Sequence, residues 1–357
     1  MEFNLSGKMT AERLQEFADK IQQLSNKIGF KVSARGWCYQ MESARLINKD
    51  QFDKVENWIN TCRERGILPI DFTAEEEGRK FSGVEKPHEQ SPIQEMREWI
   101  EASMHSEEYY TPNWWEGEEY YIQMLVEKID LKTLFTPVCE KYHIPIATSK
   151  GWSSMLQRAE YARRFKEAED KGLKSVLLYC GDFDPDGLRI SEFIQSNLES
   201  LKDIVWGDDE EGYDPEGLII KRFGLEYDFI ESNHLTWIDN LFTGSGGELA
   251  RIVDGKIVAG LTKQGRPHKN FKMNYLQEYL KKYGVRKCEA NAIVPMPKEA
   301  KILVESVIIG YLGRNADRRF RDKREKVNKT VRDFRDKTGL TQALQKALNL
   351  IDKEAQE

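Results

Sequence analysis

Ser175–Gly187 reads SVLLYCGDFDPDG, an apolar run that passes directly into a turn carrying three aspartates. Its apolar part, Ser175–Cys180, has the length and composition of a buried strand. If the chain stays extended beyond that strand, alternation places Asp182 and Asp184 on the same side of it. A proline and a glycine then turn the chain. This stretch therefore predicts a strand that delivers carboxylates to one edge of a sheet.

Strands and helices are expected to alternate on both sides of this stretch. The expected elements are Tyr120–Val126 (strand), Leu131–Tyr142 (helix), Pro145–Thr148 (strand), Ser153–Lys171 (helix), Ser175–Cys180 (strand), Leu188–Leu201 (helix) and Leu218–Phe223 (strand). This order predicts an α/β fold with a parallel sheet and flanking helices. Ligands of such sheets gather at the carboxyl ends of the strands, which is where the acidic residues fall.

A carboxylate also follows the first apolar run. Glu127 comes directly after YYIQMLV, where it faces solvent and a ligand. Carboxylates that converge on one spot repel each other unless a divalent cation neutralises them. All-oxygen ligation selects Mg²⁺ or Mn²⁺ rather than zinc, and such an ion typically serves phosphate chemistry. We therefore predict a metal site formed by Glu127, Asp182 and Asp184, with Asp186 assisting. The alternative is an acidic turn, since Asp, Pro and Gly are turn formers.

The N-terminal part predicts three helices and a strand. Apolar residues recur at helical spacing from Thr10 to about Lys27, and a second, short segment begins at Ser33. A further helix follows Asn48, and Gly66–Phe72 (GILPIDF) has the character of a strand. Three helices followed by a strand is the order of a winged helix-turn-helix, which is a DNA-binding scaffold.

Charge is distributed unevenly along the chain. The net charge is −6, but residues 73–120 carry 4 Lys/Arg against 13 Asp/Glu, and residues 314–337 carry 11 against 5. The net charge therefore conceals a basic C-terminal region, because the charge of an acidic connector offsets it. One helix is expected in this connector, near Ile93–Met104. The expected domains are an N-terminal DNA-binding domain (1–74), an acidic linker (75–117), a metal-binding sheet domain (118–300) and a helical basic tail (301–357).

Composition excludes several classes of protein. Hydrophobic residues make up 39% of the chain and charged residues 32%, which is typical of a soluble globular protein. No apolar stretch is long enough to span a membrane. Five scattered cysteines without a C-x-x-C argue against a disulfide framework and against a structural zinc site. We expect a cytoplasmic, nucleoid-associated protein with no membrane partner.

The acidic motifs resemble those of a known family. V-E-K at Val126–Lys128, T-x-K-G at Thr148–Gly151 and D-x-D-P-x-G from Asp182 are similar to motifs of the Toprim domain in the topoisomerase VI A subunit and the meiotic double-strand-break proteins. Lys287–Ala292 (KCEANA) is similar to the family's late K-x-E-x-x-A-L motif, with Ile293 in place of leucine. The resemblance runs from about residue 10 to 310. It implies an N-terminal winged helix, a Toprim-like parallel sheet and a helical tail, as in a stand-alone A-like protein.

The family's nucleophilic tyrosine lies in an R-x-x-[FY]-Y motif before the Toprim domain. This chain reads R-G-W-C-Y from Arg35 to Tyr39, with Cys38 where the family has Phe or Tyr. The resemblance implies that Tyr39 attacks a DNA phosphodiester and remains linked to the phosphate. Because a tyrosine hydroxyl is a poor nucleophile at neutral pH, Arg35 would favour the phenolate or else contact a phosphate. The alternative for Tyr39 is a core aromatic residue on a short helix.

The resemblance also implies partners. These are double-stranded DNA, Mg²⁺ or Mn²⁺, a second copy of the chain and a separate ATPase or accessory subunit. In the implied homodimer, one subunit supplies Tyr39 and the other supplies the carboxylates. The candidate DNA-contacting cations are Lys150, Arg158, Arg318, Arg319, Arg321 and Arg324. Lys128 and Glu289 are further candidates, and Glu289 is either another metal ligand or the partner of a Toprim arginine.

Two other functions fit the same residues. A Toprim nuclease would use water as the nucleophile, and Tyr39 would then be structural. A non-catalytic DNA-binding or assembly protein would keep the acidic site for its shape. The tail has an alternative as well, since its charges could form intrahelical pairs on a solvated helix.

Overall fold

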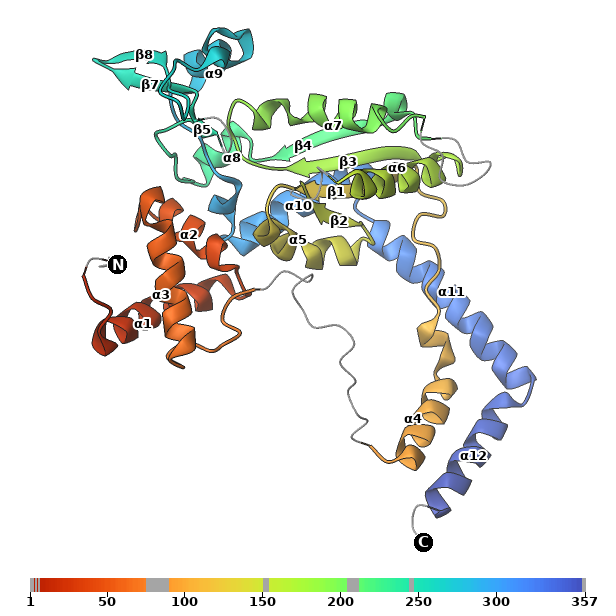
Figure 1. The fold of residues 1–357 in the computed structure, drawn as a ribbon. Helices are drawn as coiled ribbons and strands as arrows, with labels where there is room; N and C mark the ends of the chain where they lie inside the picture. Colours follow the sequence, from red (N-terminus) through yellow and green to blue (C-terminus); the bar gives the residue numbers. More distant parts are fainter. Residues whose placement is uncertain are drawn as a thin grey trace. The chain divides into compact units, whose positions relative to one another are not determined.

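The structure is a computed structural model that describes residues 3, 5, 7–74, 90–149, 154–203, 212–243 and 247–354 (Figure 1). The chain divides into two compact units. Unit 1 draws its described residues from Met1–Glu75 and Glu119–Tyr311, and unit 2 draws them from Glu76–Glu118 and Leu312–Glu357. The expected N-terminal and sheet domains thus belong to one unit.

Unit 1 begins with the three expected helices. They are α1 (Ala11–Ile28), α2 (Ala34–Ser43) and α3 (Phe52–Glu64), the last preceded by a 3₁₀ turn at Lys49–Gln51. The hydroxyl of Ser33 accepts a hydrogen bond from the Gly36 amide, which caps α2. Asn48 and Gln51 form a capping box before α3.

The prediction of a strand at residues 66–72 is wrong. The described residues there form turns, and the Phe72 amide donates to the Pro69 carbonyl over 3.0 Å. Pro69 has no amide hydrogen to give to a strand ladder, which favours a turn at this place. Phe72 is nevertheless buried, because its ring stacks on Trp37 with centroids 5.6 Å apart. The apolar residues of this segment reflect packing onto helices rather than a wing strand.

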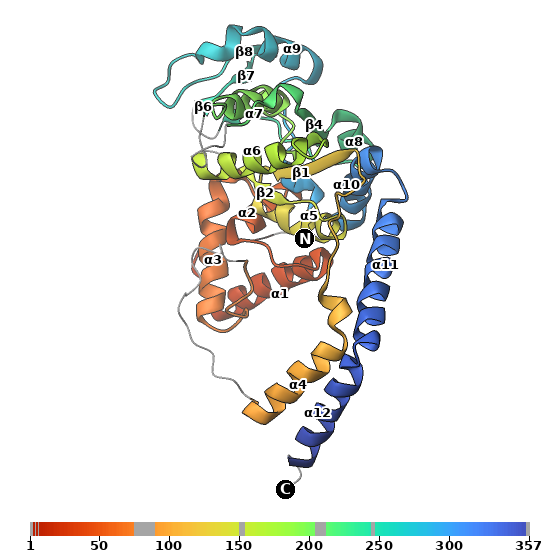
Figure 2. The ribbon, with the colours of Figure 1, turned by 90° about the vertical axis from the view of Figure 1, so that its right-hand side faces the viewer.

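The sheet of unit 1 has the expected parallel strands. β1 (Tyr120–Val126), β2 (Ile146–Thr148), β3 (Lys174–Cys180) and β4 (Ile219–Gly224) lie in the order β2-β1-β3-β4, and every pair is parallel. Helices α6 (Met155–Glu169) and α7 (Ile190–Glu199) cover one face, and α5 (Ile129–Lys141) and α10 (Pro297–Leu312) lie on the other (Figures 1 and 2). The described residues therefore confirm a mixed α/β fold with a parallel sheet and flanking helices.

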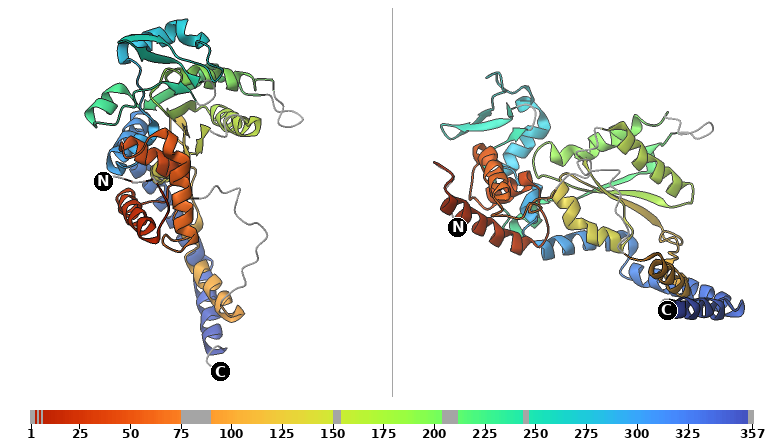
Figure 3. Two further views of the ribbon diagram at one scale, coloured as in Figure 1. Left: turned by 60° about the vertical axis from the view of Figure 1, so that its left-hand side comes forward. Right: turned by 60° about the horizontal axis from the view of Figure 1, so that its bottom comes forward.

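Strand order determines where a ligand can enter. The crossover after β1 leads to β2 on one side, and the next crossover returns to β3 on the other side. The carboxyl ends of β1 and β3 therefore form the topological switch point of the sheet, the usual position of a ligand in such folds. The helices α1, α2 and α3 lie on the side toward which the strands point (Figures 1 and 3).

The rest of unit 1 is an irregular region of short elements. They are α8 (Tyr227–Ser232), β5 (Phe242–Thr243), β6 (Gly247–Glu248), β7 (Ala250–Val253), β8 (Lys256–Ala259) and α9 (Asn274–Tyr283). Further 3₁₀ turns of unit 1 lie at Gly187–Arg189, Pro215–Gly217, Lys269–Lys272 and Ala290–Ile293, and one of unit 2 lies at Ser106–Tyr109. Strands β7 and β8 form an antiparallel hairpin.

Unit 2 joins the acidic segment to the basic tail. Helix α4 (Pro92–Met104) packs along α12 (Leu340–Glu354), which follows α11 (Ala316–Lys337). Buried Glu107 accepts from Arg335 over 2.6 Å. Trp114 packs on Phe320 with ring centroids 4.6 Å apart. The described part of the acidic segment, 90–118, is therefore a packing partner of the tail, where the sequence suggested a solvated linker. None of the described helices is long and apolar enough to cross a membrane.

Helix α2 docks onto the sheet domain through its N-terminal turn. Buried Asp130, in the first turn of α5, accepts from the Ser33 amide and from the side-chain amide of Asn291. The side chain of Gln40 donates to the Asn291 carbonyl over 3.0 Å. A Cβ at Gly36 would lie 2.3 Å from Asp130 Oδ2, so this approach requires a residue without a side chain.

Alanine substitutions at two helical glycines test how closely α2 packs on Asp130: Gly36 lies at this contact, and Gly310 serves as the control. Helix propensity alone predicts that alanine stabilises both positions. We expect Gly36→Ala instead to lower the free energy of unfolding by about 1–3 kcal/mol, because the new methyl group displaces Asp130. Gly310→Ala in α10, where nothing lies within 4 Å of the added Cβ, should raise it by up to about 1 kcal/mol. Denaturant unfolding followed by tryptophan fluorescence measures both. A neutral Gly36→Ala would contradict the close packing of α2 on Asp130.

Candidate functional site

The register of β1 against β3 brings Glu127 beside Asp182. Val126 pairs with Cys180, and the Glu127 amide continues the ladder by donating to the Cys180 carbonyl over 2.9 Å. The Asp182 amide then donates to Glu127 Oε2 over 2.7 Å. A Cβ at Gly181 would lie 2.7 Å from the same carboxylate oxygen. The glycine is therefore what allows Glu127 to fold over the end of β3.

Lys128 connects two buried carboxylates. Its Nζ donates to Asp182 Oδ1 over 2.9 Å and also to Glu289. Glu289 further accepts from Lys287 Nζ over 2.5 Å, and Asp182 accepts from the Ala290 amide over 2.6 Å. Burial disfavours an ionised Glu289, but the charges of Lys128 and Lys287 outweigh it and hold the pKa of Glu289 far below its usual range. Glu289 thus pairs with two lysines, where the sequence suggested either a metal or an arginine as its partner.

In the described part of the chain, neither Glu127 nor Asp184 forms a salt bridge with a lysine or arginine. Both side chains are half-buried, and Asp184 Oδ1 accepts only a backbone hydrogen bond, from Gly187 over 2.6 Å. Burial and then the charge of Asp182 raise the pKa of Glu127 to about 7. Burial raises the pKa of Asp184 to about 6, with a further contribution from the charge of Glu127. These two carboxyls thus carry negative charge that their surroundings disfavour.

Asp186 lies apart from this pair. Its side chain is exposed, and its Oδ1 accepts from the Tyr275 hydroxyl over 3.2 Å. Of the four carboxylates predicted to form the metal site, Asp186 therefore does not share the half-buried surroundings of Glu127 and Asp184. Among the described residues, no group of three or more His, Cys, Asp or Glu side chains has the arrangement of a metal site.

The residues present still fit a divalent cation in their chemistry. The ammonium of Lys128 already provides a positive charge beside Asp182. Glu127 and Asp184 are half-buried oxygen donors, and the charge of Glu127 contributes to the raised pKa of Asp184; such a pair favours Mg²⁺ or Mn²⁺. Glu127 and Asp184 would thus hold the ion, and Asp182 orients Lys128.

Arg222 was not expected from the sequence, and it holds the acidic loop in place. It projects from β4 and is nearly buried. Its guanidinium donates to the Asp182 carbonyl over 2.8 Å and to the carbonyls of Gly181 and Gly187 over 3.3 Å each. A cation inside the apolar run LIIKRF was the available signal. Because three loop carbonyls depend on it, Arg222 fixes the path of the chain that carries Asp182.

The KCEANA segment lies directly beside the acidic loop. Phe183 and Cys288 exchange backbone hydrogen bonds of 2.8 and 3.0 Å, so the two motifs pair as a short antiparallel bridge. The Phe183 ring packs against Tyr283 and Trp237, with centroids 5.0 and 5.6 Å away. An aromatic cluster thus anchors the loop from the side opposite to Lys128.

Tyr39 lies next to the acidic site in the same chain. Lys128 Nζ is 4.7 Å from the centroid of the Tyr39 ring, a cation–π distance. The ring is half-buried and packs edge-on against Phe52. A single chain therefore brings Tyr39 and the carboxylate cluster together, whereas the resemblance implies that they come from different subunits.

Arg35 interacts electrostatically with Tyr39 and also pairs with two carboxylates of α3. Its guanidinium pairs with Glu56 over 2.9 Å and with Asp53 over 3.4 Å, and it lies over the Phe52 ring. The cation that lies over the Tyr39 ring is Lys128. Cys38, the departure from the family motif, is buried, and burial raises the pKa of its thiol to about 12, so it is not a reactive thiol.

The cations expected to contact DNA have several roles. Lys150 lies outside the described residues. Arg158 donates to Asn197 and so links α6 to α7. Arg319 pairs with Glu118, and Arg324 donates to the Glu108 carbonyl, so both hold unit 2 together. Exposed Arg318 and Arg321 form the intrahelical pairs of the alternative interpretation, with Asp322 over 3.9 Å and Asp317 over 3.1 Å.

Comparison with known proteins gives no further guide: no family model, no curated protein and no solved structure matches this chain. The chemistry of the site must therefore be argued from its own residues.

The raised pKa values of Glu127 and Asp184 predict that the metal-free protein loses stability as the pH rises from about 4 to 7. A carboxyl with a raised pKa binds protons more tightly in the native state than in the unfolded chain. Its contribution to stability is complete below the ordinary pKa of about 4 and is lost as the pH rises through the folded pKa. That folded pKa is about 6 for Asp184 and about 7 for Glu127. The thermal midpoint, measured in EDTA across this range, should fall.

Glu127→Gln should flatten this decline, because the amide oxygen still accepts from Asp182 without gaining charge. Glu140→Gln, on the exposed side of α5, is the matched control and should keep the wild-type profile. Mg²⁺ should offset the decline in the wild type but not in Asp184→Ala. An identical decline in Glu127→Gln and wild type would contradict the role given to Glu127.

Proposed function

We propose that this protein is a metal-dependent DNA transesterase of the topoisomerase VI A type, with Tyr39 as its nucleophile. One observation carries the proposal: Tyr39 contacts Lys128, whose ammonium pairs with Asp182 at the switch point of the sheet. A candidate nucleophile, a cation and a set of carboxylates thus meet in one compact unit.

Each residue has a defined part in the reaction. The Tyr39 oxygen attacks the phosphorus of a DNA phosphodiester, the bond to one deoxyribose oxygen breaks, and that oxygen leaves as a hydroxyl after taking a proton. Lys128 packs against the Tyr39 ring and holds it beside the carboxylates. Glu127 and Asp184 would hold Mg²⁺ or Mn²⁺, which polarises the phosphoryl oxygens when bound. The tyrosyl–phosphate bond keeps the energy of the broken bond, so the reaction is reversible.

The finer assignment of the fold belongs to the same proposal. The three N-terminal helices support a helix-turn-helix domain, although the strand expected at 66–72 is not formed. The parallel sheet, with acidic residues after β1 and β3, supports a Toprim-like domain. A homodimer and a separate ATPase or accessory subunit follow from the resemblance, as does a location at the nucleoid in the cytoplasm.

The direct test is incubation with labelled supercoiled DNA and Mn²⁺, followed by denaturant and detection of DNA attached to protein. The wild type should form an adduct, and Tyr39→Phe and Glu127→Ala should lose it by at least about 100-fold, as is usual when a nucleophile or metal ligand is removed. Tyr109→Phe, at an exposed tyrosine of unit 2, is the control and should remain active.

Each other outcome of this test identifies a different protein. Cleavage by Tyr39→Phe without an adduct would replace the proposal with a Toprim nuclease that uses water. Absence of cleavage by the wild type with either Mg²⁺ or Mn²⁺ would leave a non-catalytic DNA-binding or assembly protein.

The contact between Lys128 and Tyr39 predicts a site completed within one chain. Mixing Tyr39→Phe with Glu127→Ala protein should then restore no adduct, since every chain lacks part of its own site. A site shared across a homodimer would instead give one working composite site in each mixed dimer, and would nick one strand of a duplex. Restored nicking after subunit exchange would therefore overturn the arrangement within one chain while leaving the chemistry in place.

A further inference from the structure

Unit 1 carries a basic surface in the segment 247–272, which we call the basic ribbon. It holds six Lys and Arg against two Asp and Glu, a balance of +4 in a chain of net charge −6. The exposed cations are Lys256, Lys263, Arg266, Lys269 and Lys272. In the part of the chain that the structure describes, no carboxylate forms a salt bridge with any of these five. Their charge is thus available to a polyanion.

The basic ribbon contains a short β-hairpin with an exposed apolar pair next to its turn. Ile252 of β7 pairs with Ile257 of β8, and the turn at Asp254 and Gly255 has φ angles of 49° and 74°. Positive φ at both residues is the signature of a tight type I′ turn, which keeps the two strands twisted together. Ile252 is 63% exposed and Ile257 40% exposed. An apolar pair flanked by unpaired cations is an uncommon surface for a soluble protein.

The basic ribbon leads directly into residues that contact the acidic loop. The Tyr275 hydroxyl, at the start of α9, donates to Asp186. Further along α9, the Tyr279 hydroxyl donates to the Phe183 carbonyl over 3.2 Å. The ribbon lies on the side of the sheet toward which β3 and β4 point, as α2 does (Figure 1). A polyanion bound along the ribbon is therefore directed toward the end of the sheet where Tyr39 and Glu127 lie.

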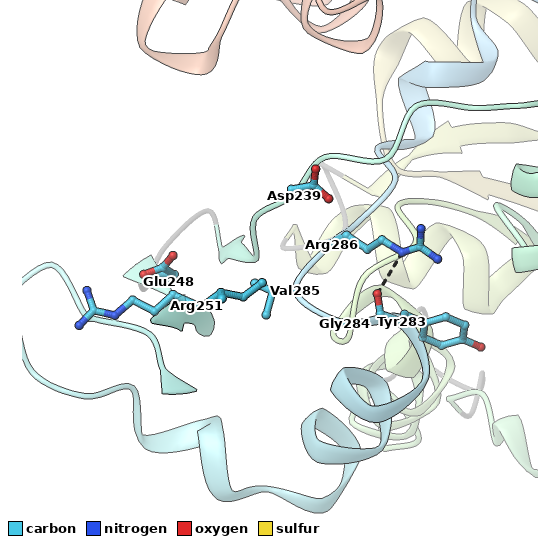
Figure 4. A pocket seen from close by; sticks show the side chains of 8 residues that line it. Asp239, Glu248, Arg251, Tyr283, Gly284, Val285 and Arg286 are labelled. Carbon is cyan, nitrogen blue, oxygen red and sulfur yellow. Dashed lines mark hydrogen bonds between the residues drawn. The ribbon is translucent and has the colours of Figure 1, made fainter. Parts of the chain in front are cut away.

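A cavity at the base of the ribbon offers a weaker alternative. It has a volume of about 450 Å³ and lies between β7 and the chain that leaves α9 (Figure 4). Its charged lining is balanced, with Asp239 and Glu248 against Arg251 and Arg286. The Arg286 guanidinium donates to the Tyr283 carbonyl and stacks on Trp237, so it is already engaged. The cavity therefore favours no anion, and the outer surface of the ribbon is the better site.

We infer that the basic ribbon is the surface by which this protein holds duplex DNA, and that its tip enters a groove while its lysines contact phosphates. The inference rests on the proposed function for its choice of DNA as the polyanion. A two-stranded β-ribbon fits the width of the major groove, and apolar tips contact thymine methyl groups there. In the tail of unit 2, Arg319 and Arg324 are bound within that unit, whereas the exposed cations of the ribbon have no carboxylate partner among the described residues.

The test is the salt dependence of binding of the full chain to a short duplex, in EDTA so that no strand is cut. Each phosphate contact contributes about 0.9 to the slope of log K against log salt. The triple variant Lys256→Ala, Lys263→Ala, Lys269→Ala should therefore flatten the slope by about 2.7. The matched control removes three exposed lysines of unit 2, Lys337, Lys346 and Lys353, and should leave the slope unchanged. Unchanged thermal midpoints verify that both variants fold.

The outcomes separate the ribbon from the chemistry. An unchanged slope in the ribbon variant, or an equal loss in the control, overturns the inference, whatever the adduct assay shows. A slope that depends on the ribbon, in a wild type that forms no adduct, supports the ribbon while the proposed chemistry fails. Binding that depends on the ribbon to anionic phospholipid vesicles, without binding to the duplex, would also overturn the inference, because the partner would then be a membrane surface.

Discussion

The parallel pairing of β1 with β3 is the constraint on which the site depends. Because Val126 lies opposite Cys180, the next residues of both strands leave the sheet side by side, and Glu127 meets the Asp182 amide. A slip of one residue would turn these side chains to opposite faces of the sheet. The buried ladder of the two strands thus fixes the acidic site, with Gly181 providing the space that Glu127 occupies.

This geometry divides the carboxylates of the site into two kinds. Asp182 and Glu289 are buried and paired with Lys128 and Lys287, an arrangement whose Coulomb energy must offset the loss of hydration. Removing Lys128 would leave buried Asp182 without its cationic partner, which typically costs about 3–5 kcal/mol. Glu127 and Asp184 are half-exposed and carry raised pKa values, so their negative charge is open to an incoming cation. The paired carboxylates therefore stabilise the site, and the unpaired ones are the part suited to chemistry.

The sequence predicted what local patterns determine. β1 lies at Tyr120–Val126 as expected, because a fully buried parallel strand is an uninterrupted apolar run. The capping box at Asn48 and the acidic turn after β3 are also local signals. The sequence motifs marked Lys128 and Glu289 as candidates, but their pairing with each other was not predictable, because the two residues are 161 positions apart. The apolar segment 66–72 misled because burial against helices and burial in a sheet leave the same composition, and only Pro69 argued against a strand.

The basic tail shows why counting charges along a chain does not locate a binding surface. The sequence places its highest density of cations at 314–337, yet Arg319 and Arg335 are matched by Glu118 and Glu107 from the acidic segment of the same unit. Those acidic residues are more than 200 positions away in sequence, so their effect is invisible to a local count. A cation that already has a carboxylate partner must lose that partner before it binds a phosphate, and the exchange leaves little net free energy. The cations of the basic ribbon have no such partner to lose among the described residues. Part of the denser cluster is thus paired within unit 2, whereas the five exposed cations of the sparser cluster have no carboxylate partner among the described residues.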